Sequence, residues 1–177
     1  MKQIKRLLSL LLAWGMLCAL FGCATKGQTE SKLKERLSSP LEMYLSVERR
    51  GEVFSANVTL GEGNTMDRDI EMAFLTPPSV KGLTVCQKNR QLTAEFGGLT
   101  VKEEAVRQIV LLLSPFSLHS YTESTAYREG KDTVFCYVGE GESITFYCEK
   151  EGFPHKIIYT LPGETLTLYP QIKGDTP

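Results

Sequence analysis

The sequence predicts an α+β fold, a curved antiparallel sheet of about nine strands with a helix packed on one face. Along most of the chain, apolar and polar residues alternate with a period of two, which is typical of strands that bury one face. Short clusters of turn residues separate these runs, as in antiparallel hairpins. One segment, Ala105–Leu113, instead spaces its apolar residues as an amphipathic helix does.

A short helix is expected before the first strand, at Lys32–Ser38, because Leu33 and Leu37 lie four residues apart. Pro40 should end it, since the residue before a proline disfavours the helical conformation. The small and polar residues Ala24–Ser31 that come before this helix are expected to form a tether.

The strands are predicted from runs in which every second residue is apolar. In the first run, Leu41, Met43 and Leu45 alternate with other residues, and Gly51-Glu52 then supplies a turn. Similar turn clusters set the other boundaries, and Pro77-Pro78 stops the third strand. The expected strands are Leu41–Arg50, Phe54–Leu60, Arg68–Thr76, Leu83–Gln87, Gln91–Phe96, Thr133–Val138, Ser143–Cys148, His155–Leu161 and Glu164–Tyr169.

The main helix, expected at Val101–Ser114, has a start signal and a stop signal. Thr100 and Glu103 match a capping box, in which the two side chains accept hydrogen bonds from free backbone N–H groups. Pro115 closes or kinks the helix. Its C-terminal half is apolar on nearly every side, so it should be covered on most sides or line an apolar cavity. A polar loop is expected at His119–Lys131.

The first 23 residues resemble a bacterial lipoprotein signal. Three basic residues precede Leu7–Phe21, an uncharged run of 15 residues. That run is shorter than the roughly 20 apolar residues of a membrane-spanning helix. The sequence Leu20-Phe21-Gly22-Cys23 resembles a lipobox, in which the cysteine is lipidated and becomes the mature N-terminus.

The signal predicts how the chain is divided and where it lies. We expect a signal peptide at residues 1–22, a lipidated N-terminus and tether at residues 23–31, and a single domain at residues 32–177. Lipid on Cys23, palmitate included, would anchor the protein at the extracytoplasmic face of the cell membrane. Ordinary secretion and an uncleaved anchor are the alternatives.

The balance of charge argues against one class of partner. The chain has 20 basic and 21 acidic residues, and loss of the three basic residues of the signal leaves 17 against 21, a net charge of −4. A protein with this charge is not attracted to nucleic acid or to an anionic membrane surface through its bulk charge. We therefore expect no nucleic-acid partner.

Three of the five cysteines, Cys86, Cys136 and Cys148, lie beyond the signal, and an odd number fits a disulfide framework poorly. If Val138 pairs with Ser143 across the intervening turn, Cys136 and Cys148 fall on opposite faces of the hairpin. We expect free thiols that act as small apolar residues, with a bridge between these two cysteines as the alternative.

The sequence contains no recognisable catalytic constellation. His119 and His155 lack metal-ligand spacing to another histidine, a cysteine or a carboxylate, and no nucleophile elbow or phosphate loop is present. Asp67, Asp69 and Glu71 alternate and could share one face, for which solvation is the expectation and a calcium site the alternative. We therefore expect a non-enzymatic protein with no metal and no cofactor.

The order of elements resembles the LolA-like superfamily, which includes periplasmic lipoprotein carriers, RseB-type sensors and the LppX/LprG lipoproteins. The matching features are a strand that ends in Pro77-Pro78, a hairpin turn at Lys88-Asn89-Arg90, an apolar helix after it, and Glu151-Gly152-Phe153-Pro154 before a late strand. The resemblance covers most of the mature chain. It implies an incomplete β-barrel whose concave face is covered by helix, with lipid or acyl chains bound between sheet and helix.

The functional candidates are therefore apolar residues of the sheet and the helix. Those expected to line a ligand cavity are Met43, Phe54, Met72, Phe74, Ile109, Leu112, Leu113 and Phe116. A filled core is the alternative, because a domain of this size needs about this many apolar residues in any case. The expected function is binding of lipid, acyl chains or a lipoprotein. The alternative is a structural or regulatory envelope lipoprotein that binds another protein and holds no ligand.

Overall fold

A computed structural model describes residues 30–63, 67–102, 104–118, 121, 123–149 and 153–174. The predicted signal peptide, the lipidation candidate Cys23 and the tether up to residue 29 lie outside the described residues, as do Glu103 and His119. Within the described ranges, no helix is both long enough and apolar enough to span a bilayer.

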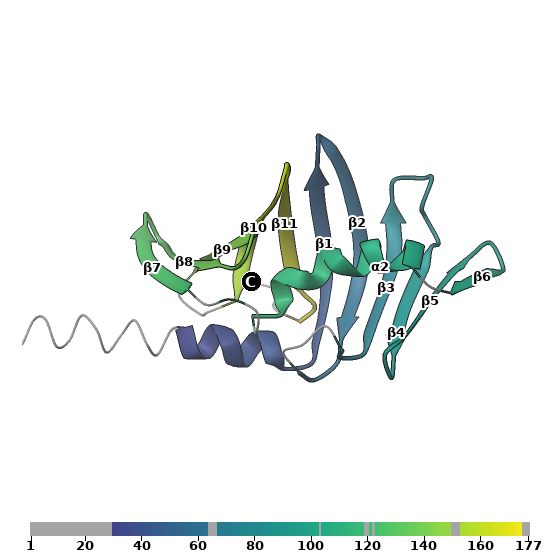
Figure 1. Cartoon of the computed structure of the whole chain (residues 1–177), viewed down its shortest axis with the longest axis horizontal. Coiled ribbons are helices and arrows are strands. Elements are labelled where there is room, and N and C mark those ends of the chain that lie inside the picture. Colours follow the sequence, from purple (N-terminus) through teal and green to yellow (C-terminus); the bar gives the residue numbers. More distant parts are fainter. Residues whose placement is uncertain are drawn as a thin grey trace, which may run out of the picture.

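Eleven strands form one antiparallel sheet, which is two more than the sequence predicted. Their order across the sheet is β6-β5-β4-β3-β2-β1-β11-β10-β9-β8-β7, so the sheet is open and ends at β6 and β7. Figure 1 shows the sheet curving around the helices. The strands are β1 (Leu41–Arg49), β2 (Glu52–Leu60), β3 (Ile70–Thr76), β4 (Thr84–Lys88), β5 (Gln91–Phe96), β6 (Leu99–Lys102), β7 (Glu123–Glu129), β8 (Asp132–Val138), β9 (Ser143–Cys148), β10 (Pro154–Leu161) and β11 (Glu164–Ile172).

The two additional strands are the edge strands, and both replace predicted non-strand segments. Gly97 and Gly98 have positive φ angles of 58° and 82°, which form a tight turn and lay β6 against β5. The predicted capping box was therefore wrong, because Thr100 lies within β6 and faces Glu95. The predicted loop His119–Lys131 was also wrong over most of its described length, because β7 pairs with β8 along seven residues.

The predicted short helix is confirmed, and it occupies residues 30–38. Its Leu33 and Leu37 are almost completely buried. It lies under the β8–β10 side of the sheet in Figure 1. There the Tyr137 hydroxyl donates a hydrogen bond to Glu30 at 3.3 Å, and the Lys34 ammonium lies 5.8 Å from the centre of the Tyr137 ring.

The predicted main helix is shorter and less regular than expected. An α-helix, α2 (Glu104–Val110), continues directly into a 3₁₀ helix, η1 (Leu111–Phe116). Pro115 lies inside η1 and is tolerated there, since 3₁₀ segments are short connecting turns. Together α2 and η1 cross the concave face in front of β1 to β4 (Figure 1).

The core lies on the concave face, between the sheet and the helices. In β1, Met43, Leu45 and Val47 are buried, and the intervening residues are exposed or half-buried, as the predicted alternation requires. The same face of β9 buries Ile144, Phe146 and Cys148. Burying one large apolar side chain stabilises the fold by roughly 1.5–3 kcal/mol. The one-sided core explains why the sheet needs helices on this face.

Candidate functional site

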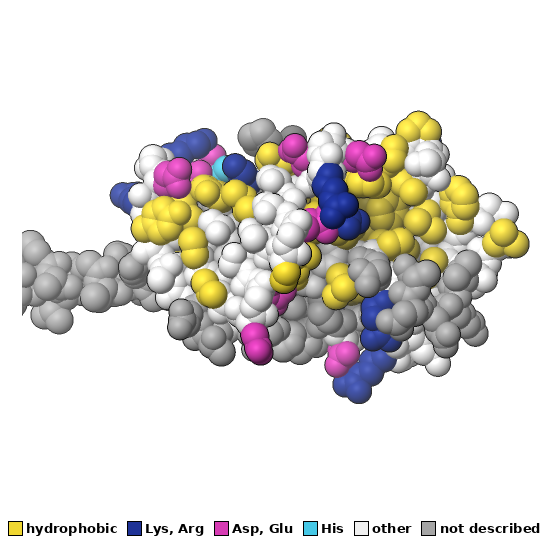
Figure 2. Space-filling model, turned by 45° about the horizontal axis from the view of Figure 1, so that its top comes forward, with side chains coloured by type: hydrophobic (Ala, Val, Ile, Leu, Met, Phe, Trp, Pro, Cys, Tyr) yellow, Lys and Arg dark blue, Asp and Glu magenta, His cyan; other side chains and the backbone are white. Residues whose placement is uncertain are grey.

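A small apolar recess lies between η1 and the middle of the sheet. Its volume is about 10 Å³, close to that of one water molecule. Strands β1, β2 and β3 form its floor, and Leu112 of η1 covers it. The lining residues are Leu45, Val47, Phe54, Ser55, Ala56, Met72, Phe74 and Leu112. In Figure 2, hydrophobic side chains gather around a hollow near the upper ends of these strands.

The one polar side chain of the recess is already paired. Ser55 is buried, and its hydroxyl lies 2.7 Å from the hydroxyl of Thr76 on β3. Because each hydroxyl has a partner, the recess presents no unsatisfied polar group to a ligand. The recess therefore suits an aliphatic chain and gives no basis for polar recognition at its floor.

The structure brings four of the eight predicted lining residues to this recess, namely Phe54, Met72, Phe74 and Leu112. The others lie elsewhere in the same core. Met43, Leu113 and Phe116 are buried almost completely, and Ile109 is half-buried against the core. Phe54 and Leu112 are also half-buried, so the recess is reached from the surface.

Charged side chains follow the recess-lining residues along β1. Arg49 follows Val47 by two residues on β1 and therefore lies on the same face of the strand. It forms a two-pronged contact with Glu164, with Nε–Oε1 at 2.7 Å and Nη2–Oε2 at 3.0 Å. Arg50 approaches the same carboxylate at 3.3 Å. Arg49 is the main cause of the lowered pKa of Glu164.

Arg68 is a buried charged residue that is not among the predicted site residues. Its side chain is 6% exposed. Nη1 donates to the carbonyl of Leu37 at 2.7 Å and of Gly63 at 3.0 Å, and Nη2 donates to the carbonyl of Phe116 at 3.1 Å. Burial lowers the pKa of Arg68 to about 10. The guanidinium thereby joins the N-terminal helix, the β2–β3 loop and the end of η1.

A signal for Arg68 does exist in the sequence. It lies two residues before Ile70 and four before Met72. In an extended chain its side chain therefore points to the same face as those two side chains, which face the core. A basic residue that comes just before a strand, on the side of its buried face, indicates a buried arginine, and such a group needs hydrogen-bond acceptors close by.

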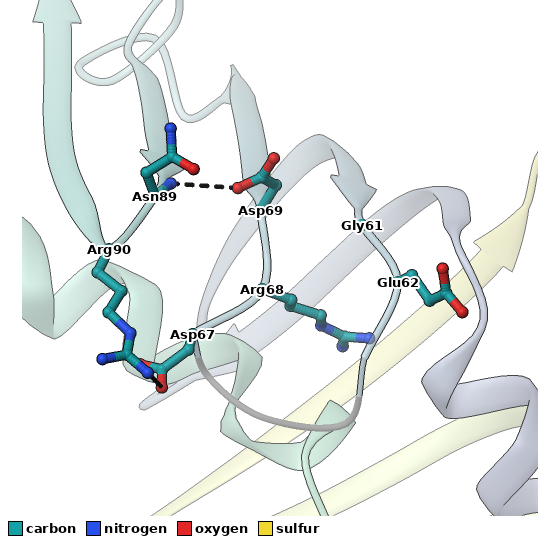
Figure 3. A pocket seen from close by; sticks show the side chains of 7 residues that line it. All are labelled: Gly61, Glu62, Asp67, Arg68, Asp69, Asn89 and Arg90. Carbon is teal, nitrogen blue, oxygen red and sulfur yellow. Dashed lines mark hydrogen bonds and ion pairs between the residues drawn. The ribbon is translucent and has the colours of Figure 1, made fainter.

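A polar cleft of about 460 Å³ lies beside Arg68, where the β2–β3 and β4–β5 connections meet (Figure 3). Arg90 and Asp67 form an ion pair at 3.0 Å, and Asp69 accepts a hydrogen bond from the backbone N–H of Asn89 at 3.3 Å. Of the three alternating acidic residues, Asp67 and Asp69 line this cleft, whereas Glu71 is an exposed residue of β3. The cleft mixes charges of both signs and presents no constellation for catalysis among its described residues.

The three described thiols are free, as the sequence predicted. Val138 pairs with Ser143, so Cys136 lies opposite Thr145 and Cys148 opposite Thr133. Cys148 is buried in the core, whereas Cys136 and Cys86 are half-buried. Burial, with a smaller contribution from Asp132, raises the pKa of Cys148 to about 12. A thiol with this pKa is a core residue, not a nucleophile.

Comparison with known proteins defines the fold and not the function. No family model matches the chain. No curated protein matches its sequence. Among solved structures, an uncharacterised conserved protein from Thermus thermophilus is 12% identical, with a TM-score of 0.50 over 86% of this chain and 90% of the other. At that identity, the likeness shows a shared fold alone.

Two further structural matches carry names from the group that the sequence resembles. A LolA superfamily protein from Nitrosomonas europaea is 10% identical, with a TM-score of 0.48 over 85% of this chain and 94% of the other. The lipoprotein LppX from Mycobacterium tuberculosis is 11% identical, with a TM-score of 0.46 over 84% of this chain and 98% of the other.

Proposed function

We propose that this chain is a membrane-anchored, extracytoplasmic lipoprotein that binds an acyl chain, from a lipid or a lipoprotein, between the sheet and η1. It performs no chemistry on that ligand. The observation that carries the proposal is the apolar recess beneath Leu112, which opens to the surface through half-buried Phe54. An aliphatic chain is the ligand that such a lining accepts without leaving a polar group unpaired.

Binding requires η1 to move, because the recess now holds about 10 Å³. Lifting η1 exposes Leu112 and Leu113, and each large apolar side chain returned to water costs roughly 1.5–3 kcal/mol. An entering acyl chain offsets this, since each buried CH₂ group contributes about 0.8 kcal/mol. A chain of a dozen or so carbons can therefore replace the contacts that η1 loses.

The short helices suit such a movement. A 3₁₀ helix has poorer hydrogen-bond geometry than an α-helix, and η1 is six residues long with Pro115 inside it. Two features hold η1 in place. They are the hydrogen bond from Arg68 to the Phe116 carbonyl and the burial of the Leu113 and Phe116 side chains. Displacing η1 therefore leaves all the strand pairings intact.

The test uses the full chain in proteoliposomes that contain a phospholipid with a photoreactive acyl chain. Cross-links are mapped to peptides by mass spectrometry. The proposal expects cross-links at Phe54, Met72 and Leu112, in addition to any at the predicted signal or at Cys23. Cross-links confined to residues 1–23 would contradict it, because they would show a membrane anchor without a binding site.

A matched pair of variants sharpens this test. Leu112→Trp places a large side chain in the recess, whereas Leu111→Trp adds the same volume to a neighbouring side chain that is 43% exposed. We expect Leu112→Trp to lower cross-linking at Phe54 and Met72, and Leu111→Trp to leave it unchanged. Equal cross-linking in the two variants would argue against the recess as the site.

The nearly filled recess also favours a second function, namely an envelope lipoprotein that binds another protein and holds no ligand. The edge strand β6 presents Leu99, which is 73% exposed, next to Phe96, which is 47% exposed. An open sheet edge with apolar side chains can accept an added strand. Cross-linking on cells separates the two functions, because this one yields a stoichiometric protein adduct through β6 and no lipid adduct.

A further inference from the structure

Three metal-ligating side chains converge at one end of strands β8, β9 and β10, away from the recess. They are Asp132, the first residue of β8; Glu149, directly after β9; and His155, near the start of β10. One ligand atom of each lies within 4.8 Å of the other two. Figure 2 shows a histidine side chain among acidic and basic side chains at the left of the molecule. The three come from separate parts of the sequence, so local spacing gives no sign of them.

The backbone directs these side chains together. Thr133 pairs with Cys148, so Asp132 and Glu149 are the next residues on the two neighbouring strands. The register between β9 and β10 shifts between Pro154 and Lys156, which makes His155 the extra residue of a bulge. Bulges of this kind turn a side chain in a new direction and are common beside functional sites.

The two carboxylates of this cluster are only partly compensated. They lie on facing strand positions, where like charges repel each other, although Lys131 pairs with Glu149 and His155 lies 3.2 Å from Asp132. In addition, Oδ1 of Asp132 is buried and has no hydrogen-bond partner among the described residues. An unsatisfied buried carboxylate oxygen is costly, and a cation held by both oxygens of this carboxylate would satisfy it.

The spacing fits a transition-metal ion. Nε2 of His155 and Oδ2 of Asp132 are 3.2 Å apart. Two ligand atoms that each lie about 2.0–2.1 Å from a tetrahedral metal ion are roughly 3.3 Å from each other. The nitrogen and oxygen of this pair therefore already have the separation of two ligands of one ion. Glu149 is 56% exposed and can turn to close the third contact. Both oxygens of Asp132, one oxygen of Glu149 and one nitrogen of His155 supply four ligand atoms, the number that zinc usually takes.

We propose that Asp132, Glu149 and His155 bind a divalent transition-metal ion of the Zn²⁺ class, which fastens the ends of β8, β9 and β10. The ammonium of Lys131 now contacts Glu149 and competes with the ion for that carboxylate. Lys131 is 76% exposed, so it can turn into solvent when the ion binds. This inference does not depend on the proposed lipid binding.

The test titrates the ¹⁵N-histidine-labelled full chain, in detergent and reductant, with Zn²⁺ alone. The chain has two histidines, so its imidazole spectrum contains two sets of signals, and His155→Gln identifies which set belongs to His155. We expect the His155 signals to move and the His119 signals to stay. Saturating Zn²⁺ should also raise Tm by about 5 °C, because it binds the folded state alone.

Variants separate a metal site from an ion-pair cluster. Asp132→Asn or Glu149→Gln should weaken Zn²⁺ binding more than roughly 10–100-fold. That range is typical of mutations in residues that only orient the metal ligands through hydrogen bonds. Glu140→Gln removes an exposed carboxylate at the other end of the same hairpin and should change it less than about twofold. Lys131→Met should strengthen binding, since it removes the competing ammonium.

The outcomes that overturn the proposal are equally concrete. His155 signals that do not move, His119 signals that move instead, or equal affinity in Asp132→Asn and Glu140→Gln would each show that Zn²⁺ binds elsewhere, thiolates included. Tm of each variant in a chelator shows whether it is folded. Glu149→Gln alters an exposed side chain, so it decides the question even if Asp132→Asn fails to fold.

Discussion

Nη2 of Arg68 donates a hydrogen bond of 3.1 Å to the carbonyl oxygen of Phe116, the last residue of η1. The two residues are 48 positions apart in the sequence, and both side chains are buried. This bond closes the end of the 3₁₀ helix, whose last carbonyl groups have no partner within the helix. It attaches the cover of the apolar recess to the end of the sheet.

Arg68→Met should therefore loosen η1 more than it destabilises the whole fold. It leaves the carbonyls of Leu37 and Phe116 without this donor, and a buried acceptor left unpaired costs roughly 1–3 kcal/mol. Removal of a buried charge offsets part of that cost. Hydrogen exchange should accelerate in residues 111–116 and remain slow in β1 and β11.

Arg90→Met is the matched control, because Arg90 lines the same polar cleft but is 77% exposed in its ion pair with Asp67. Exposed ion pairs contribute roughly 0–1 kcal/mol, so exchange in residues 111–116 should not change. If Arg68→Met and Arg90→Met give the same exchange pattern, the bond from Arg68 does not hold η1.

The packing of η1 predicts a contrast between two neighbouring leucines. Leu113 is 1% exposed, whereas Leu111 is 43% exposed. Leu113→Ala removes buried methyl groups and leaves a cavity, so it should lower the free energy of unfolding by about 2–5 kcal/mol. Leu111→Ala should change it by about 0.5 kcal/mol or less. Urea unfolding followed by circular dichroism measures both, and equal losses would show that η1 is rotated relative to the sheet.

Much of the sheet was predictable because a strand with one buried face follows a period of two. In β1 and β9, every second residue is buried, and each strand lies within two residues of its predicted bounds. Leu33 and Leu37 similarly predicted the N-terminal helix, and Pro77-Pro78 predicted the end of β3.

The edge strands were missed because pairing, and not burial, determines them. The pattern Thr100–Glu103 is typical of a helix start, yet the Gly97-Gly98 turn lays Leu99–Lys102 against β5. Strand β7 is mostly exposed, so its sequence carries no alternation. Contacts between distant segments, such as Arg68 with Phe116 or Asp132 with His155, arise from the folded sheet and leave no local pattern.

The raised pKa of Cys148 predicts how the thiols differ in reactivity. At pH 8, a thiol with a pKa of about 12 carries almost no thiolate, and Cys148 is also buried. Iodoacetamide should modify half-buried Cys86 and Cys136 before Cys148, as peptide mapping would show. Early modification of Cys148 would mean that β9 opens in the folded protein.

The same shift predicts a loss of stability at alkaline pH. Above pH 9 the unfolded chain loses the Cys148 proton and the folded chain keeps it, so stability falls as pH rises toward 12. The slope is at most about 1.4 kcal/mol per pH unit for one group. Cys148→Ala should reduce the slope between pH 9 and 10.5. An unchanged slope in Cys148→Ala would assign the loss to other groups.

The lipobox predicts that Cys23 determines where the protein is found. Cys23→Ala removes the thiol to which lipid is attached, so the variant should lose labelling by an alkyne analogue of palmitate. It should also leave the membrane fraction or accumulate as a larger, unprocessed chain. Cys18→Ala, which alters the other cysteine of the signal, is the control and should be labelled and fractionate normally. Normal labelling of Cys23→Ala would disprove lipidation at this residue, and unchanged fractionation without labelling would point to an uncleaved anchor.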